Sequence, residues 1–419
     1  MPTSLPLSPP ASVDWGVVAI FGIVYLGMFL GGLPKLKLDR SGVALLGAIA
    51  IIGLGALSTE QAARAVDLPT VVLLFSFMVV SAQMRLGGFY TAVTRGVAAL
   101  PLSRNGLLGA LLAVAASLSA VFSNDIVCLA MTPVVARICL QRGFAPVPFL
   151  VGLACAANIG SAATLIGNPQ NMLIGSLLQL SFAEYARTAL PPVILSLLAL
   201  WAWLTLGRHD TPVTPAPVPP ALPPDDAPTF DRWQTIKGLC MASALLVIFL
   251  FTDWTREVAA LVAAGLLLLS RRFHSSHVMG FIDWELLVLF IGLFVVNHAF
   301  EATGFAAQAV AWLAAQGVQL AEPGPLFVAG IALSNLVSNV PAAMLLMPHL
   351  DTHAAGTTLA LVSTFAGNLL LVGSIANLIV VDLARKSGIE IGWRSHACIG
   401  VPITFATLAI IWFWLRWMT

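Results

Sequence analysis

The chain has 419 residues, of which 59% are hydrophobic and only 9% are charged. Because soluble domains carry about 25% charged residues, this composition excludes a soluble protein and predicts an integral membrane protein. The formal net charge of +1 gives no indication of a nucleic-acid partner.

The N-terminus is rich in proline and has no basic residue before its first apolar run. It is therefore predicted to be a tail, not a cleavable signal peptide, and the first apolar run is retained as a membrane span.

Ten apolar stretches are long enough, or nearly so, for a membrane-spanning helix, which needs about 20 residues. They are 15–32, 42–57, 68–86, 147–180, 189–207, 235–252, 256–270, 283–301, 356–387 and 395–417. Two of them, 147–180 and 356–387, are too long for one simple crossing and carry glycine and asparagine interruptions. Each is predicted to be a broken helix.

Two further apolar stretches, 105–140 and 325–350, carry Ser-Asn in the middle. Each could be two spans or one re-entrant hairpin, and we favour hairpins. Polar backbone at membrane depth is tolerated only where protein or water covers it.

A polar, proline-rich segment divides the chain almost in half. Its composition cannot build a core, so 208–234 is predicted to be an extended linker. The fold class that follows is an all-α polytopic membrane protein with two repeats, 1–207 and 235–419.

The two halves share an outline. Weak internal similarity of this kind is typical of transporters built from repeats. Glycine and asparagine recur four residues apart in both broken helices, with a separation of 206 residues between the halves. Three more pairs are each separated by 215 residues: Phe75 with Phe290, Asn124 with Asn339, and Pro133 with Pro348.

The charges predict the topology. With five crossings in each half, the second half is inverted, and 16 of the 20 lysine and arginine residues fall on one side. The positive-inside rule makes that side the cytoplasm. Both termini are then periplasmic, the linker is cytoplasmic, and the hairpins open to opposite sides.

Four polar clusters fall at membrane depth in this topology. They are 123–125 and 338–339 at the hairpin tips, and the breaks at 158–171 and 368–377. Broken helices expose backbone groups there, so that half-helix N-termini favour anions or oxygen-rich solutes and unwound carbonyls can hold cations. The alternative is that such residues only hold helices together.

Asp125 is the most informative single residue. An ionisable group inside a membrane protein is a functional-site hypothesis, and burial disfavours its charged form, so Asp125 could take up and release a proton. The alternative is a hairpin cap. Its counterpart is Val340. His298 is a second candidate proton carrier, and the alternative is a packed neutral histidine.

The five cysteines are odd in number and mostly in apolar segments, which argues against a disulfide framework. Cys128 and Cys139 lie eleven residues apart on one helix and cannot share a ligand. Cys128 with Cys155 remains possible as a thiol site. No metal site and no cofactor is predicted.

Two stretches, "FSNDIVCLAMTPVV" and "ANIGSAATLIGNPQN", resemble the ArsB/NhaD group of the ion transporter superfamily. They are similar to those of ArsB-type arsenite exporters and plant silicon efflux transporters, and more distantly to sodium–dicarboxylate carriers. The resemblance implies an elevator-type transporter. The dicarboxylate carriers typically have Ser-Asn-Thr at both tips, whereas the third positions here are Asp125 and Val340. This difference disfavours sodium–dicarboxylate symport.

The resemblance and the four clusters together give the predicted substrate and ion site. Its residues are Ser123, Asn124, Asp125, Asn158, Gly167, Asn168 and Asn171 in the first half, and Ser338, Asn339, Asn368, Gly373, Ser374 and Asn377 in the second.

The predicted function is proton-coupled export of a small metalloid hydroxide, arsenite or antimonite, by a homodimer in the lipid bilayer of a bacterial inner membrane. Alternatives are silicic acid efflux, organic or inorganic anion transport, sodium–proton antiport and a passive channel. An enzyme is not predicted, since the chain has no His-Glu-x-x-His and no Gly-x-Ser-x-Gly motif.

Overall fold

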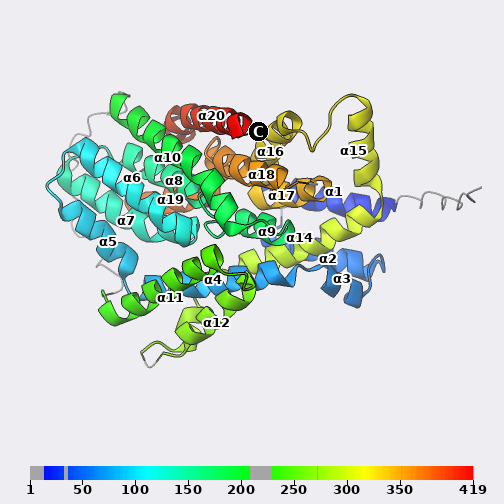
Figure 1. Ribbon diagram of the computed structural model, residues 1–419, viewed down its shortest axis with the longest axis horizontal. Helices are drawn as coiled ribbons and strands as arrows, with labels where there is room; N and C mark the ends of the chain where they lie inside the picture. Colours follow the sequence, from blue (N-terminus) through cyan, green and yellow to red (C-terminus); the bar gives the residue numbers. More distant parts are fainter. Residues whose placement is uncertain (1–13, 33–35, 208–228, 271, 351, 419) are drawn as a thin grey trace, which may run out of the picture. The chain divides into compact units, whose positions relative to one another are not determined.

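The computed structural model describes residues 14–32, 36–207, 229–270, 272–350 and 352–418. The predicted tail and nearly all of the predicted linker lie outside these residues. Every regular element in the described ranges is helical, with 20 α-helices and two short 3-10 helices (Figure 1). The all-α prediction is confirmed.

Seven described helices are long and apolar enough to cross a membrane, which confirms a polytopic membrane protein. They are α4 (Leu68–Leu86), α6 (Arg104–Val121), α7 (Asn124–Arg142), α10 (Phe182–Leu206), α11 (Arg232–Phe251), α14 (Trp284–Ala302) and α20 (Trp393–Met418).

The chain forms two compact units, and each contains segments from both halves. The smaller unit comprises Met1–Asp67 and Trp284–Pro325. Within it α14 lies close to α2, since a Cβ atom at Gly292 would come within 2.7 Å of the backbone of Ala44. Besides α14, its helices are α1 (Trp15–Leu30), α2 (Arg40–Gly53), α3 (Thr59–Ala65) and α15 (Phe305–Ala315).

The larger unit comprises Leu68–Asp283 and Leu326–Thr419. Its remaining helices in the first half are α5 (Phe89–Ala99), α8 (Pro146–Ser161) and α9 (Pro169–Leu177). In the second half they are α12 (Arg256–Leu268), α13 (Ser275–Met279), most of α16 (Pro323–Val337), α17 (Asn339–Leu346), η1 (Met347–His349), α18 (His353–Ala366), η2 (Leu371–Gly373) and α19 (Ile375–Lys386).

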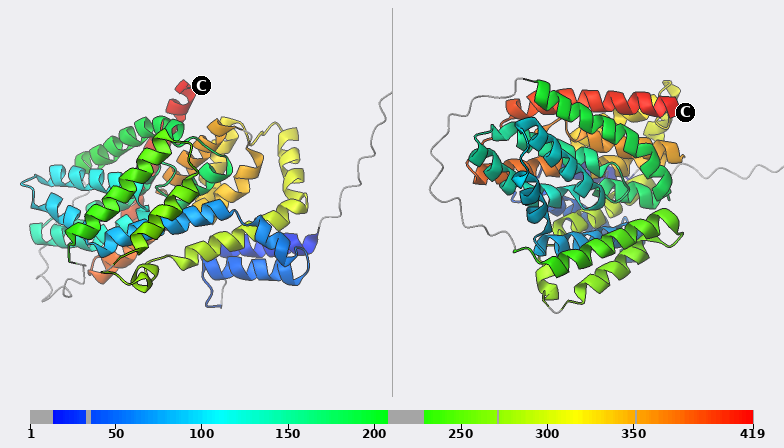
Figure 2. Two further views of the ribbon diagram at one scale, coloured as in Figure 1. Left: turned by 60° about the horizontal axis from the view of Figure 1, so that its bottom comes forward. Right: turned by 60° about the vertical axis from the view of Figure 1, so that its left-hand side comes forward.

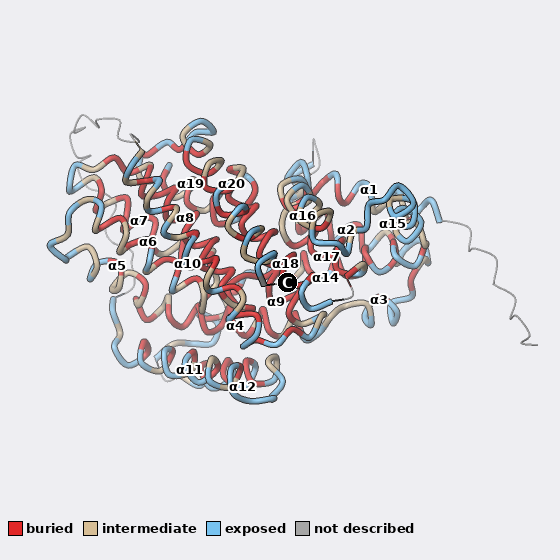
Figure 3. The backbone as a smooth tube through the Cα atoms, turned by 45° about the horizontal axis from the view of Figure 1, so that its top comes forward, coloured by how far each residue is buried: buried red, intermediate tan, exposed pale blue. Residues whose placement is uncertain are grey.

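Helix α8 is the centre of the larger unit. Every residue of α8 except Val147 is buried (Figure 3), and α6, α7, α10, α19 and α20 all pack against it. At the crossing with α6, a Cβ atom at Gly160 would come within 2.3 Å of the Cα atom of Ala116. Only glycine permits so close an approach of two helices.

Helices α10 and α20 run side by side in opposite directions (Figure 2). Near one end, the indole N–H of Trp203 donates to the carbonyl oxygen of Cys398 at 3.4 Å. Near the other end, Trp414 donates to the carbonyl oxygen of Thr188 at 2.9 Å. These bonds place the first turns of the two helices at opposite ends of the pair.

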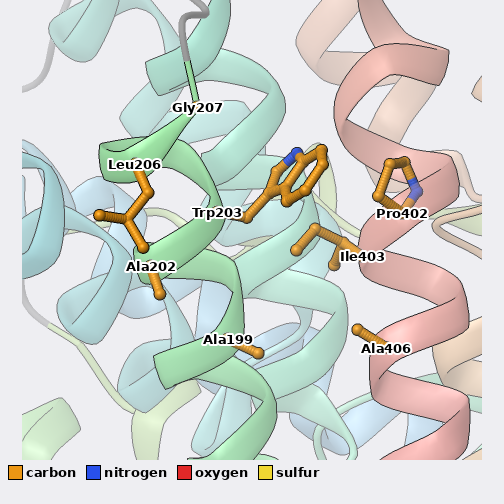
Figure 4. A pocket seen from close by; sticks show the side chains of 8 residues that line it. All are labelled: Ala199, Ala202, Trp203, Leu206, Gly207, Pro402, Ile403 and Ala406. Atoms are coloured by element: carbon orange, nitrogen blue, oxygen red, sulfur yellow. The ribbon is translucent and has the colours of Figure 1, made fainter.

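An apolar groove lies between α10 and α20 (Figure 4). Its volume is about 460 Å³, and Trp203 and Ile403 extend into the space between the helices. The groove carries no ionisable side chain among its lining residues. It is therefore an apolar surface feature and lacks the chemistry of a site for a polar solute.

Candidate functional site

The first polar tip is the turn between α6 and α7. Ser123 is the N-cap of α7, and Asn124 begins the helix. The backbone N–H of Asn124 donates to the carbonyl oxygen of Gly167 at 3.3 Å, which ties this tip to the break that follows α8. At the far end of α7, Arg142 donates to the carbonyl oxygen of Ala98, just before α6. The two helices therefore return to the same end.

The second tip is the turn between α16 and α17. Ser338 is the N-cap of α17, with φ of 78° and ψ of 161°. This backbone region is adopted almost only by glycine, and strain of this kind is concentrated at functional sites. Near the tip, the side-chain amide of Asn335 donates to the carbonyl oxygen of Ala366 at 3.1 Å. The second tip thus lies against the second break.

Both predicted broken helices are interrupted. Helix α8 ends at Ser161, and α9 begins at Pro169, a residue preorganised for a first helical position. Asn168 caps α9 by accepting from the backbone N–H of Asn171 at 2.9 Å. In the second half α18 ends at Ala366, and Ser374 is the N-cap of α19.

Glycines make both breaks possible. A Cβ atom at Gly167 would come within 2.2 Å of the carbonyl oxygen of Ser161. A Cβ atom at Gly373 would come within 3.1 Å of the side-chain oxygen of Asn335. The first position excludes any other residue unless the backbone shifts, and the second is less restrictive.

Asn158 joins both halves. Its amide nitrogen donates to Asn368 at 2.8 Å and more weakly to Asn377 at 3.4 Å. Its side-chain oxygen accepts from the side-chain amide of Asn124 and from the Ser374 hydroxyl, both at 3.0 Å. One buried asparagine on α8 therefore connects the first tip with the second break.

Thr364, which the sequence did not single out, has the corresponding role on α18. The side-chain amide of Asn168 donates to its hydroxyl oxygen at 3.3 Å. That hydroxyl donates to the carbonyl oxygen of Ala360 at 2.8 Å and lies 3.3 Å from the side-chain oxygen of Asn171. Gln170 also donates to the Thr364 hydroxyl oxygen, at 3.2 Å. The only signal in the sequence was that Thr364 lies 206 residues after Asn158, the separation already seen for the breaks.

The two breaks repeat the same hydrogen bonds at this separation. The amide of Asn171 donates to the carbonyl oxygen of Thr164 at 3.1 Å, and that of Asn377 donates to the carbonyl oxygen of Leu370 at 3.2 Å. The contacts between halves are also reciprocal. The Asn158 side chain contacts Asn377 at 3.4 Å, just as the Thr364 side chain contacts Asn171 at 3.3 Å.

Several polar atoms in this region are buried and have no hydrogen-bond partner among the described residues. Three are acceptors, the side-chain oxygens of Asn124, Asn335 and Asn339, and one is a donor, the amide nitrogen of Asn368. The hydroxyl groups of Ser119 and Ser334, which can donate and accept, are also buried and unpaired. Buried polar groups are normally paired, so unpaired ones require an explanation, and a bound solute or ion is one.

Four helix N-termini belong to the same region. Those of α7, α9, α17 and α19 begin at the tips and breaks described above. Their free N–H groups and partial positive charge favour oxygen ligands. The hydrogen-bonded residues of this region include no Lys or Arg side chain, so a fully charged anion would have only helix ends and neutral donors.

Asp125 lies in the first turn of α7, next to Asn124, and is half-buried. No described residue forms a hydrogen bond or ion pair with its carboxylate. His298 lies on α14 in the smaller unit with an exposed side chain, and the hydrogen bonds above do not include it.

Cys128 and Cys155 are fully buried in the larger unit. The described residues contain no group of three His, Cys, Asp or Glu side chains able to hold a metal ion.

A buried polar centre built from helix ends and interrupted helices is the arrangement found in secondary transporters. This helical membrane protein therefore belongs to that class. The model of the citrate transporter family (CitMHS) matches residues 28–366, and the chain belongs to this family. The predicted relationship to the ArsB/NhaD group is thereby confirmed, and the family contains transporters, not enzymes.

Relatives and a solved structure agree with this assignment. The silicon efflux transporter LSI3 of Oryza sativa subsp. japonica is 29% identical, covering 95% of this chain and 96% of its own. The putative transporter arsB of Dictyostelium discoideum is 23% identical, covering 90% of this chain and 87% of its own. The YdaH transporter of Alcanivorax borkumensis shares the fold, with a TM-score of 0.55, 16% identity, and coverage of 96% of this chain and 97% of its own.

Proposed function

We propose that this protein is a proton-coupled secondary transporter that exports a small neutral metalloid hydroxide, arsenite or antimonite, across a bacterial inner membrane. The observation that carries the proposal is the set of buried unpaired polar atoms around the two breaks. Three of them accept hydrogen bonds, one donates, and the hydroxyl groups of Ser119 and Ser334 can do both.

This set matches a neutral hydroxide better than it matches an anion. Undissociated arsenite presents three O–H donors and oxygen acceptors, and the free polar atoms of the region likewise include both acceptors and donors. A carboxylate only accepts hydrogen bonds, and the region offers it no Lys or Arg side chain. Organic or inorganic anion transport, including that of citrate, is therefore the less favoured alternative.

Asp125 is the proposed proton carrier. It directly follows Asn124, whose side-chain oxygen is one of the free acceptors. A carboxylate that has no hydrogen-bond or ion-pair partner among the described residues is less strongly held in its charged form and can take up a proton. Proton uptake at Asp125 would thus change the charge beside the substrate, which supports proton coupling. His298 remains a second candidate carrier.

The architecture we propose is a pair of inverted repeats, 1–207 and 235–419, that work as an elevator in a homodimer. The reciprocal hydrogen bonds at a fixed separation support the repeats. Cysteines placed at Gln316 and Glu390, after replacement of the exposed Cys240 and Cys398, test the topology. We expect Gln316→Cys to react only with periplasmic reagent and Glu390→Cys only with cytoplasmic reagent. The reverse pattern would contradict the assignment.

The decisive experiment measures arsenite accumulation in inverted membrane vesicles with an acidic interior. We expect gradient-dependent, saturable accumulation that is abolished in Asp125→Asn. Asp382→Asn is the matched control, because Asp382 pairs with Lys386 on the surface and the substitution is chemically the same. Accumulation without a gradient, linear in concentration, would indicate a passive channel.

Silicic acid is the second candidate substrate. It is also a small neutral hydroxide, and the similarity to the silicon efflux transporter LSI3 favours it. The same vesicles, supplied with silicic acid in place of arsenite, distinguish the two. If silicic acid accumulated and arsenite did not, the proposed site and proton coupling would stand, and silicic acid would replace arsenite as the proposed substrate.

A further inference from the structure

Two buried aromatic side chains, Tyr185 and His396, hold the two breaks in the same way. Tyr185 is the fourth residue of α10, and His396 is the fourth residue of α20. The Tyr185 hydroxyl donates to the carbonyl oxygen of Ala162 at 2.9 Å. Nε2 of His396 lies 3.2 Å from the carbonyl oxygen of Asn368. Both side chains are at most 3% exposed.

The two acceptors correspond as closely as the two donors. Ala162 directly follows α8, and Asn368 lies 206 residues further along the chain, the separation of the other paired bonds. Unlike Ala162, Asn368 also has a polar side chain. Its side-chain oxygen accepts from Asn158, and its buried amide nitrogen has no hydrogen-bond partner among the described residues. The second contact therefore acts on a residue that faces the site directly.

We propose that His396 is a positioning residue that orients Asn368 toward the substrate and makes the second break sensitive to pH. A carbonyl oxygen can only accept, so Nε2 carries a hydrogen in both charge states of the imidazole. A proton taken from solvent adds to Nδ1. Charge-assisted hydrogen bonds are roughly twice as strong as neutral ones. Protonation therefore tightens the hold on Asn368, whereas the phenol of Tyr185 stays neutral.

No charged side chain competes for this role from the neighbouring helices. Helices α8, α10, α18 and η2 pack against α20. The ionisable residues of α10 lie in its first turns, which the Trp414 bond places at the far end of α20. The one on α18, His353, begins that helix, whereas Asn368 follows its end. The ionisable residues of these helices and of α20 itself are Cys155, Glu184, Tyr185, Arg187, His353, Arg394, Cys398 and Arg416.

The test compares His396→Gln with the wild type by hydrogen–deuterium exchange of residues 367–373 at several pH values. Glutamine keeps a side-chain N–H at similar reach but does not titrate. At about pH 8.5, where imidazole is neutral, we expect equal exchange. At a pH low enough to protonate the buried imidazole, we expect about fivefold faster exchange in His396→Gln. Asp125 is present in both proteins, so its titration cancels in the ratio.

The break at 162–168 is the internal control, since its holding residue is Tyr185 in both proteins. Its exchange ratio should stay at one. A ratio at 367–373 that is the same at every pH would overturn the proposal.

The role in substrate positioning rests on the proposed function and needs transport to be measured. We expect His396→Leu, which lacks the donor, to raise KM about tenfold at all pH values, since the orphaned carbonyl oxygen is costly. His396→Gln should match the wild type at high pH only, and Tyr185→Phe should keep the wild-type pH dependence. An unchanged KM in His396→Leu would overturn the positioning role. The exchange ratio is measured without substrate, so the proposed pH sensitivity of the second break is tested even if the protein does not transport metalloids.

Discussion

Replacing Asn158 with alanine tests whether this residue connects the two halves. The substitution removes hydrogen bonds to Asn124, Asn368 and Ser374 at 2.8 to 3.0 Å, and a longer one to Asn377 at 3.4 Å. Hydrogen bonds within membrane proteins average about 0.6 kcal/mol each and reach about 1.7. Groups left unpaired in a buried site add to this cost. We therefore expect a loss of about 2 to 4 kcal/mol of unfolding free energy.

The assay is unfolding in mixed detergent micelles by SDS titration. Ser374→Ala, which removes only one of these bonds, should cost about 0.6 kcal/mol. Asn105→Ala removes an exposed asparagine and should change stability by less than about 0.5 kcal/mol. If Asn158→Ala is no less stable than Ser374→Ala, the four hydrogen bonds do not act together and the reasoning fails.

Three further predictions concern backbone and capping. Gly167→Ala should abolish transport and Gly373→Ala should only weaken it, because the added Cβ would lie 2.2 Å from its nearest neighbour in the first case and 3.1 Å in the second; equal vesicle uptake by both would contradict this. Ser338→Gly should raise the free energy of unfolding by about 1 kcal/mol, because glycine relieves the strain of a φ of +78°. Ser123→Gly, at a φ of −56°, should give no such increase. Unfolding by SDS titration measures both, and an equal change in the two variants would contradict the prediction. Hydrogen bonds from the Gly42 N–H and the Ser41 hydroxyl hold the pKa of Asp39 below its ordinary value. The capping stability is therefore present above about pH 4 and lost as the pH falls through the lowered pKa. Asp39→Ala should cost about 1 kcal/mol at neutral pH and progressively less in acid; a cost independent of pH would refute it.

The sequence was most informative where polar residues interrupt apolar runs. Glycine, proline and asparagine have strong backbone preferences, so the sequence alone placed the breaks within 158–171 and 368–377. The structure has them at 162–168 and 367–374. The short helices α3, α5, α13 and α15 were not predicted. Each has 11 residues or fewer, which is too short to stand out in a search for spans of about 20 apolar residues.

The site residues that were missed share one property. Thr364, Tyr185 and His396 each lie within a helix, as single polar or aromatic residues among apolar ones. A single residue of this type is usually part of the packing, so it carries little signal by itself. Their partners are carbonyl oxygens and amides of other segments, and only the folded chain brings these together.

The differences between the halves matter because the framework around them is so similar. A ligand shifts a conformational equilibrium only by the difference between its affinities for the two states. If inverted repeats with identical chemistry exchanged conformations, a proton would bind both states equally and would not shift the equilibrium between them. Here the titratable groups break the equivalence. Asp125 corresponds to Val340, and His396 corresponds to Tyr185. With the roles proposed for Asp125 and His396, the first half would take up its proton at a tip and the second behind a break, so protonation would favour one of the two states over the other.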